Sequence, residues 1–339
     1  MASAQSGGPY VITKSVISGG GGRTTGGNFT LDGSFGQPMA GNSTGSNFAL
    51  NSGFWNGGSG TTPVTRRPFD YDGDGRADLS VRRPSTGFWY ILRGTAGYMV
   101  MAWGVATDNV TPADFDGDGK TDVAVFRPST GTWFWFNSGS QTFQQDVWGA
   151  PGDLPVPADH DADHKADLVI FRPSTGTWYR KMSADSSFSV TGFGVPGDKP
   201  VIGDFDGDGK ADIAIFRPSD GNWYILKTGF GFFIQTWGQT GDIQAPADFD
   251  GDGTTDIAVF RPSTGQWFRN MSTSGFGVAS WGTSGDIPVP ADYDGDGKED
   301  IAIFRASNAT WYIINSTAGI LVNPFGTSED IPTQSSFIY

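Results

Sequence analysis

The stretch Asp114-Phe115-Asp116-Gly117-Asp118-Gly119-Lys120-Thr121-Asp122 decides the fold of this chain, because it recurs at a nearly constant spacing. The motif Asp-x-Asp-Gly-Asp-Gly-x-x-Asp, degraded in the third copy, recurs every 44 or 45 residues and begins at Asp70, Asp114, Asp159, Asp204, Asp248 and Asp292. Tandem self-similarity at this period indicates one repetitive architecture rather than several unrelated domains.

Each loop lies between the same short segments. In the second copy, residues 123–127 (Val-Ala-Val-Phe-Arg) follow the loop, and a Pro-Ser-Thr-Gly turn leads into Thr132-Trp133-Phe134. The units close on an aromatic–glycine pair: Trp103-Gly104, Trp148-Gly149, Phe193-Gly194, Trp237-Gly238, Trp281-Gly282 and Phe325-Gly326. We expect four short strands per unit and find no helical periodicity. Four strands in 40–45 residues is the size of a blade, so the sequence predicts an all-β propeller of four-stranded blades.

Paired prolines place the first strand of each unit. Pro155 and Pro157, like Pro288 and Pro290, are two residues apart, so both prolines of a pair remove N–H groups from the same side of the strand. Only an edge strand tolerates that loss. We therefore expect the first strand to be the innermost strand of its blade, beside the central axis.

The number of blades has two interpretations. Six full units are followed by a seventh copy of the first strand alone, Asp330-Ile331-Pro332-Thr333. In a six-bladed ring that strand would complete the first blade, where Thr65-Arg66-Arg67 replaces the usual segment. In a seven-bladed ring it would join strands from the N-terminal segment. We favour six blades.

The aspartates of the loops have the spacing of ligands for a hard cation. Alternate residues of a tight loop can point inward, so positions 1, 3, 5 and 9 would supply carboxylates and position 7 a backbone carbonyl. Oxygen ligands without His or Cys favour Ca²⁺. The predicted ligands are Asp70, Asp72, Asp74, Arg76 and Asp78; Asp114, Asp116, Asp118, Lys120 and Asp122; Asp159, Asp161, Asp163, Lys165 and Asp167; Asp204, Asp206, Asp208, Lys210 and Asp212; Asp248, Asp250, Asp252, Thr254 and Asp256; and Asp292, Asp294, Asp296, Lys298 and Asp300.

Other interpretations of these loops are weaker. An EF-hand or dockerin loop needs a carboxylate at position 12 and flanking helices, whereas position 12 of the second loop is Val125. Plain Asp-Gly turns without metal remain an alternative, although four converging carboxylates repel one another when no cation is present. In the third copy His164 replaces the turn glycine and must adopt a left-handed conformation, so we expect the weakest of up to six sites there. His160 and His164 are interpreted as loop substitutions, not catalysts.

Composition agrees with the metal hypothesis. The net charge is −14, and 24 of the 36 acidic residues are loop aspartates, so six divalent cations would reduce the net charge to −2. An acidic chain argues against nucleic acid as a partner.

The chain has no cysteine, and no apolar run is long enough to span a membrane. Residues 1–5 end in a small-x-small pattern that resembles a trimmed export signal, with an ordinary terminus as the alternative.

The loop together with Phe-Arg-Pro-Ser-Thr-Gly-x-Trp resembles the FG-GAP/VCBS-type repeats of bacterial secreted and surface proteins, and more distantly the calcium-bearing blades of integrin α-subunits and of certain fungal lectins. The resemblance covers residues 65–339. It implies a Ca²⁺-stabilised propeller outside the cell, used for adhesion or ligand binding. It does not name the ligand.

The N-terminal segment has a different pattern. Residues 1–60 lack the motif and contain three strand-like pieces, at 10–13, 28–31 and 47–50, separated by Gly/Ser-rich turns; residues 57–63 look like a linker. We expect two domains, a Gly-rich β module at 1–60 and the propeller at 61–339.

Three functions are considered for this sequence. The first is a non-catalytic binding or adhesion module whose partner is a protein or glycan outside the cell. The second is a subunit of an extracellular filament that polymerises through the N-terminal β segment, with copies of itself as partners. The third, an enzyme, is disfavoured because the chain has no cysteine nucleophile, no Gly-x-Ser-x-Gly and no histidine outside one loop. The tryptophans and arginines that recur in register are expected to pack in the core or make repeated structural contacts rather than bind a ligand; they are Trp89, Trp133, Trp178, Trp223, Trp267 and Trp311, and Arg127, Arg172, Arg217, Arg261 and Arg305.

Overall fold

The computed structural model describes residues 68–335 and six strands between Ser6 and Asn51. The chain divides into two compact units, Met1–Val64 and Thr65–Tyr339. Each unit is described by itself. The two domains predicted at 1–60 and 61–339 stay a prediction.

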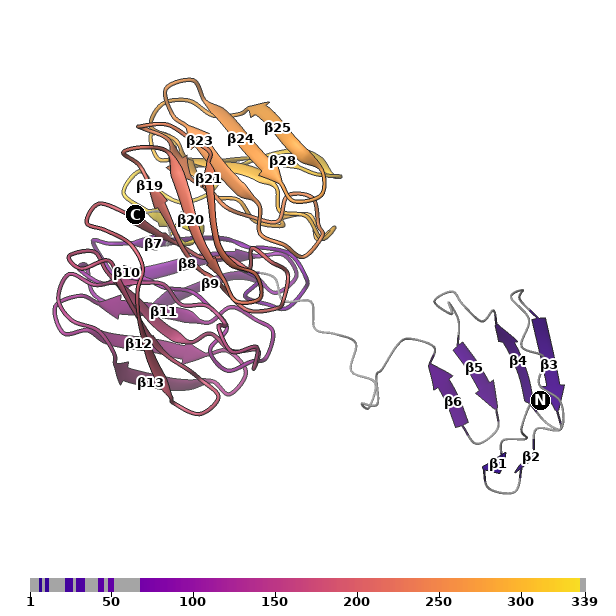
Figure 1. The fold of residues 1–339 in the computed structure, drawn as a ribbon. Helices are drawn as coiled ribbons and strands as arrows, with labels where there is room; N and C mark the ends of the chain where they lie inside the picture. The colour runs from indigo at the N-terminus through magenta and orange to yellow at the C-terminus, as the bar shows by residue number, and fades with distance from the viewer. Residues whose placement is uncertain are drawn as a thin grey trace. The chain divides into compact units, whose positions relative to one another are not determined.

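Unit 2 is a ring of six four-stranded antiparallel sheets, as predicted (Figure 1). From the inside outward, the first two blades are β30 (Ile331–Pro332), β7 (Leu79–Arg83), β8 (Phe88–Arg93) and β9 (Gly97–Ala102); and β10 (Asn109–Val110), β11 (Val123–Arg127), β12 (Thr132–Asn137) and β13 (Thr142–Val147). The third and fourth are β14 (Leu154–Pro155), β15 (Leu168–Arg172), β16 (Thr177–Lys181) and β17 (Phe188–Gly192); and β18 (Lys199–Val201), β19 (Ile213–Arg217), β20 (Asn222–Lys227) and β21 (Gly231–Thr236). The fifth and sixth are β22 (Ile243–Gln244), β23 (Ile257–Arg261), β24 (Gln266–Met271) and β25 (Gly275–Ser280); and β26 (Ile287–Pro288), β27 (Ile301–Arg305), β28 (Thr310–Asn315) and β29 (Gly319–Pro324).

The first blade is completed by the other end of the propeller. β30 pairs antiparallel with β7, with Ile331 opposite Arg82 and Pro332 opposite Val81, and the short 3-10 turn η1 (Thr333–Ser335) follows it. No strand of unit 1 belongs to a blade among the residues that the structure describes. The six-bladed interpretation is therefore confirmed, and the seven-bladed alternative is wrong.

The paired prolines lie where the sequence predicts them. The residue between them donates its amide outward, Val156 N to Val169 O at 2.7 Å and Val289 N to Ala302 O at 2.9 Å. The flanking prolines therefore face the other side of the innermost strand, toward the axis, where no ladder bond is lost.

The recurring tryptophans form the core, as expected. All six are fully buried, and each indole N–H donates to the carbonyl of the aromatic residue that closes its own blade, for example Trp133 Nε1 to Trp148 O at 2.8 Å. The hydrophobic clusters extend across neighbouring blades; one contains Phe171 and Trp178 of the third blade with Ile213 of the fourth. Burial of these aromatic side chains between blades is thus the main apolar contribution to the stability of the propeller.

The recurring arginines also have the structural role that was expected. Each guanidinium makes a bidentate pair with an aspartate 19 residues earlier, for example Arg127 with Asp108 at 2.9 Å for both bonds. The same guanidinium lies 4.5 Å from the centre of the Phe134 ring. The aspartates are almost fully buried, so each pair fixes the innermost strand to its neighbour at one end of the blade.

Unit 1 consists of three hairpins in the described residues: β1 (Ser6–Gly7) with β2 (Tyr10–Val11), β3 (Gly22–Gly26) with β4 (Phe29–Gly33), and β5 (Asn42–Gly45) with β6 (Phe48–Asn51). The three predicted strand-like pieces are present as β2, β4 and β6. Their partners were wrongly assigned to turns, because Gly/Ser/Thr-rich strands lack the apolar alternation that reveals a strand. The predicted linker at 57–63 lies outside the described residues. No described helix is long and apolar enough to cross a membrane.

Candidate metal centres

Each aspartate loop is a compact turn built on its first carboxylate. In the first loop the two oxygens of Asp70 accept the amides of Gly73 and Gly75, at 2.7 and 2.9 Å. Both glycines have positive φ, 80° and 86°. The motif predicts this conformation at position 6, and the structure has it at position 4 as well. These bonds alone would suit a plain Asp-Gly turn.

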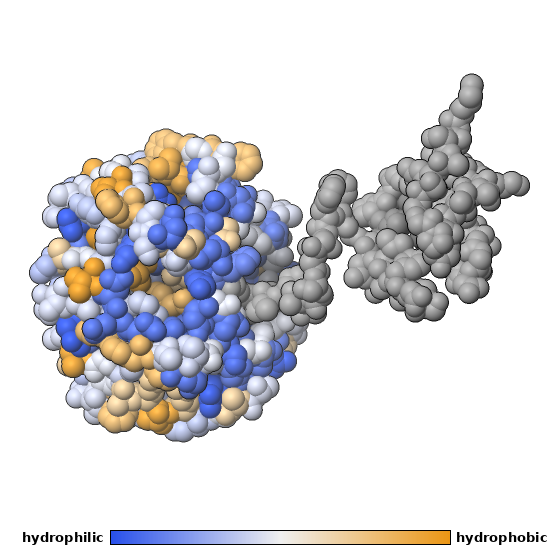
Figure 2. All heavy atoms as spheres, turned by 90° about the horizontal axis from the view of Figure 1, so that it is seen from below, coloured by the Kyte–Doolittle hydropathy of each residue, from blue (hydrophilic) through white to orange (hydrophobic). Residues whose placement is uncertain are grey.

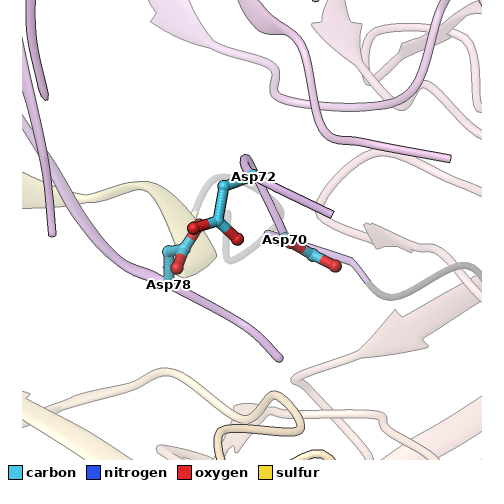
Figure 3. A group of neighbouring side chains, drawn as sticks. All are labelled: Asp70, Asp72 and Asp78. Atoms are coloured by element: carbon cyan, nitrogen blue, oxygen red, sulfur yellow. The ribbon is translucent and has the colours of Figure 1, made fainter. Parts of the chain in front are cut away.

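Three of the four predicted carboxylates come together in the loop. In five loops, one oxygen from each of positions 1, 3 and 9 lies within 4.8 Å of the others, for example in Asp70, Asp72 and Asp78. Figure 3 shows these three side chains, with the carboxylates of Asp72 and Asp78 directed toward one another. The sixth loop has the same framework, since Asp292 and Asp300 accept the amides of Gly295 and Tyr293. Three converging carboxylate oxygens are the donor set of a hard cation.

The carboxylate at position 9 is buried in all six loops. Asp78 Oδ2 accepts the amide of Tyr71 at 2.9 Å and Oδ1 that of Gly94 at 2.8 Å. Burial nevertheless raises the pKa of this carboxyl to about 7, and the negative charges of Asp72 and Asp70 add to the effect. The pKa of the equivalent residue is also raised, to about 6 or 7, in the other loops: Asp122, Asp167, Asp212, Asp256 and Asp300. Near neutral pH each loop thus concentrates negative charge that lacks a balancing positive charge.

The carboxylate at position 3 supplies the observation that separates a metal site from a turn. One oxygen of Asp250 accepts the amides of Thr273 and Ser274 from the β24–β25 turn, at 3.0 and 2.7 Å. Its other oxygen is buried and accepts no hydrogen bond in the structure. The same holds for one oxygen of Asp161, Asp206 and Asp294. A buried carboxylate oxygen without a partner is costly, and a bound cation would satisfy it.

Position 5 is placed differently from the expectation. Its carboxylate is outside the groups formed by positions 1, 3 and 9. Instead it accepts the amide of position 7 and a hydroxyl from the turn after the third strand, as Asp252 does from Ser272 Oγ at 2.6 Å. This hydroxyl recurs 16 residues after position 9 in five units, at Ser138, Ser183, Thr228, Ser272 and Ser316. That periodicity was available in the sequence and was missed.

The third loop shows how the degraded motif is accommodated. His164 has a φ of 75°, as predicted, and Ala162 at position 4 has one of 66°. His160 occupies the buried aromatic position of the other loops, and neither ring nitrogen has a hydrogen-bond partner. Burial, with the nearby Arg180 guanidinium, lowers the pKa of His160 to about 3, so the ring is neutral. Asp159, Asp161 and Asp167 still come together. That this site is the weakest stays a prediction.

The loops are also hydrogen-bonded to one another, which sequence reasoning missed. The amide at position 8 of each loop donates to the carbonyl of position 1 in the preceding blade, with N–O distances of 2.6–2.8 Å. Thr121 N donates to Asp70 O, and Ala77 N donates to Asp292 O, so the series closes from the sixth blade to the first. The candidate sites therefore lie in a continuous ring of contacts between blades. Backbone donors leave no trace in residue identity, so nothing in the sequence could have revealed them.

The side chain at position 7 covers the neighbouring loop. A Cβ atom added to Gly117 would lie 3.2 Å from carbons of Lys165, and one added to Gly295 would lie 3.0 Å from Arg76. In five blades this residue is Lys or Arg, so a cationic side chain extends over the acidic loop of the preceding blade. It offsets part of the charge repulsion there.

The pKa values predict an inverted pH dependence for the metal-free protein. The carboxyls at position 9 titrate at about 6–7 when folded and near 4 when unfolded, so the folded state holds more protons between these values. Stability should therefore rise as the pH falls from 8 to 5.5, with a gain of several degrees in melting temperature. Calorimetry of metal-stripped protein at the two pH values measures this gain. With saturating Ca²⁺ the direction should reverse, since protons then compete with the cation. A melting temperature that does not change with pH in the metal-stripped protein would contradict the raised pKa values at position 9.

Comparisons with known proteins agree with this architecture. No curated protein matches the chain. Among solved structures it is similar to an Agrocybe aegerita lectin described as recognising non-reducing terminal N-acetylglucosamine, at 20% identity and a TM-score of 0.49, over 74% of this chain and 76% of the lectin. It is also similar to Staphylococcus aureus virginiamycin B lyase with quinupristin, at 8% identity and a TM-score of 0.51, over 78% of this chain and 86% of the lyase. The likeness to the lyase is one of fold alone.

A family model gives the more specific match. The FG-GAP-like repeat matches residues 70–125, 114–170, 204–259 and 248–303, each match running from one aspartate loop into the strand after the next. Together these matches cover more than half of the chain, and the architecture they imply is the one observed. The chain belongs to the FG-GAP-like repeat family.

Proposed function

We propose that this protein is a calcium-stabilised propeller that binds ligands outside the cell, in adhesion or recognition, without catalysis. The propeller fold of FG-GAP-like repeats suits such a role. The proposal for the metal rests on the buried, unpartnered carboxylate oxygens at position 3, and the proposal for the ligand rests on aromatic side chains exposed around the rim.

Calcium would be held by the chain's own loop oxygens. Positions 1, 3 and 9 form the group seen in the structure, and position 5 with the carbonyl of position 7 is proposed to complete the shell. A hard cation takes six to eight oxygen ligands, which carboxylates and carbonyls provide. When bound, it supplies positive charge where the carboxylates at position 9 are buried. Because neighbouring loops are hydrogen-bonded, each ion would stiffen a junction between blades.

The rim carries an aromatic pair at five of the six junctions between blades. The half-buried aromatic that closes one blade meets an aromatic on the outer strand of the next, as Trp103 meets Phe143 with ring centres 5.6 Å apart. The other pairs are Trp148 with Phe188, Phe193 with Phe232, Trp237 with Phe276, and Phe325 with Tyr98. In each pair the residue on the outer strand is more than half exposed.

These aromatic pairs are the best candidate for the ligand surface. An exposed ring in the same place on blade after blade adds little to the core, whereas aromatic faces are favourable contacts for sugars and for apolar side chains. Repetition around a ring gives several equivalent sites on one molecule. Multivalent engagement of a glycan-coated or protein-coated surface would then raise the avidity by about 10²–10⁴ over one site.

A surface-binding assay tests this role. Wild-type protein in Ca²⁺ is first screened on a glycan array and on immobilised extracellular proteins to find a binder. A triple variant, Phe143→Ala with Phe188→Ala and Phe276→Ala, should then lose at least about tenfold in apparent affinity, since it removes three of the five pairs. Gln145→Ala is the matched control, because Gln145 is exposed two residues along the same outer strand. Unchanged binding by the triple variant would refute the rim as the ligand site.

The filament hypothesis remains the second proposal. The three hairpins of unit 1 are the observation that favours it, because strand-rich segments can add to a sheet edge of another copy. Negative-stain microscopy and light scattering would show elongated particles, and deletion of residues 1–60 should abolish them. Particles that persist after the deletion would rule out this route to assembly.

A further inference from the structure

The outer strand of each blade is the last in its sheet, so its outward backbone groups have no partner strand among the described residues. Natural proteins protect such edges with charges, prolines or glycines. Five of the six outer strands have a recognisable protection. β13 contains Asp146, paired with Lys181 of the next blade, and β29 contains Pro324. β17 and β25 carry small and polar residues or an internal glycine, and one face of β9 is half-buried.

β21 is the least protected of the six, since its polar residues, Gln235 and Thr236, lie only at its C-terminal end. Its sequence, Gly-Phe-Phe-Ile-Gln-Thr, has no charge, no proline and no internal glycine. Phe232 and Ile234 are exposed on one side of the strand and Phe233 on the other, and Phe230 in the preceding turn is 79% exposed. The nearest ammonium, Lys227 Nζ, donates to Phe205 O at 2.6 Å and lies 5.1 Å from the centre of the Phe233 ring, so it is held against the blade. Figure 2 shows hydrophobic residues at the surface of unit 2 among hydrophilic ones.

We propose that β21 is a self-association edge, where two copies of this chain join their fourth blades into one eight-stranded sheet about a two-fold axis. Charge permits a second copy as the occupant: the chain carries −14, which opposes the close approach of two copies, and β21 itself carries no acidic residue. The strand can pair antiparallel with itself, which closes as a dimer and leaves the rest of the rim free.

The exposed apolar area matches that of a small interface. With about 200 Å² for each large side chain, the exposed fractions of Phe230, Phe232, Phe233 and Ile234 amount to roughly 400 Å² per copy. Complete burial of these side chains in both copies would remove at most about 800 Å², so with the paired backbone the interface is at the small end of specific interfaces. This goes beyond ligand binding, because it assigns a partner, a second copy, to one edge of one blade.

A matched pair of charge substitutions tests the edge in the full chain with saturating Ca²⁺. Ile234→Lys places an ammonium on β21, and Val278→Lys places one at the same register on β25, since Ile234 lies opposite Tyr224 and Val278 opposite Phe268. In sedimentation velocity at about 50 μM, wild type and Val278→Lys should have twice the 36.0 kDa mass of the chain, and Ile234→Lys should be monomeric, with at least a tenfold weaker dimer constant.

A cysteine crosslink identifies the contact independently. The chain has no cysteine, so Gln235→Cys introduces a single thiol on β21. It should form an intermolecular disulfide on mild oxidation, whereas Ser280→Cys at the end of β25 should not. A monomeric wild type at 50 μM, a dimeric Ile234→Lys variant, or equal crosslinking of the two cysteines would each overturn the proposal. Either result leaves the rim-binding assay intact, because Phe143, Phe188 and Phe276 lie on other blades.

Discussion

Removal of calcium is expected to lower the melting temperature of this protein by about 15 °C or more. Extracellular calcium modules bind with dissociation constants of roughly 10⁻⁴–10⁻³ M, and tenfold saturation stabilises a fold by about 1.4 kcal/mol per site. Six sites would then contribute on the order of 8 kcal/mol, which is comparable with the stability of a whole domain. For a propeller of this size each kcal/mol corresponds to roughly 2 °C or slightly more. Calorimetry with 2 mM Ca²⁺ and with excess EDTA measures the shift.

Single-site variants make this experiment specific to the loops. Asp250→Asn removes a carboxylate whose oxygen is buried without a partner, so calorimetric titration should find one fewer calcium per chain. Asp185→Asn is the control, because Asp185 is an exposed acid outside the loops whose hydrogen bonds are local, from Ser187. Equal stoichiometry in the two variants, or a melting curve that EDTA leaves unchanged, would refute the metal assignment.

The sequence was sufficient for the blade and for the order of its strands. The 44–45-residue period, the paired prolines and the recurring tryptophans depend on local chemistry repeated six times, so one unit could be checked against the others. Repetition also identified the arginines as structural, although not their partners. The aspartate 19 residues earlier follows a glycine in four of the five pairs, and it could have been matched with its arginine because both recur with the same period.

What the sequence could not predict depends on backbone atoms and burial. The bonds from position 8 to the preceding loop involve only main-chain groups, and the raised pKa at position 9 results from desolvation by residues of several strands. Blade number was ambiguous for a related reason. The first blade differs from the others, with Ser80 and Arg82 in place of Ala124 and Phe126 of the second. No pattern within the repeat therefore indicates which strand pairs with β7 on the inner side of this blade.

The polar residues of the first blade fix the strand that closes the ring. The hydroxyl of Ser80 is hydrogen-bonded to that of Thr333 in a buried position, and Tyr71 Oη lies 3.1 Å from the same Thr333 hydroxyl. Gln334 Nε2 donates to the carbonyl of Asp78 at 2.6 Å. The first aspartate loop and the segment that closes the ring are therefore in direct contact. Loss of closure should weaken the first calcium site, and loss of calcium should weaken closure.

Asp330→Asn is accordingly expected to destabilise the protein more than the same change inside a blade. Asp330 pairs with Arg83 at 2.8 and 3.0 Å across the closure, and Asp242 pairs with Arg261 at 2.8 Å within the fifth blade. The two pairs match in burial, since both aspartate side chains are at most 1% exposed and the arginines are 21% and 20% exposed. Removing one partner of a buried ion pair lowers the free energy of unfolding by about 3–5 kcal/mol. Because both arginines are partly exposed, we expect each variant to lose about 3 kcal/mol or less.

The two variants differ in how the chain holds the affected strand. In Asp242→Asn, β22 continues through its metal loop into β23 of the same blade, so it stays in place after the pair is lost. β30 has no such continuation into β7, so Asp330→Asn should detach it, with a fall in melting temperature roughly twice that of Asp242→Asn.

Glu329 lies 3.5 Å from Arg83 and can replace part of the lost charge, so Glu329→Gln is combined with Asp330→Asn. Hydrogen exchange should then rise in β7 for this variant and only in the fifth blade for Asp242→Asn. Equal melting temperatures with unchanged exchange in β7 would show that the ring does not depend on this closure.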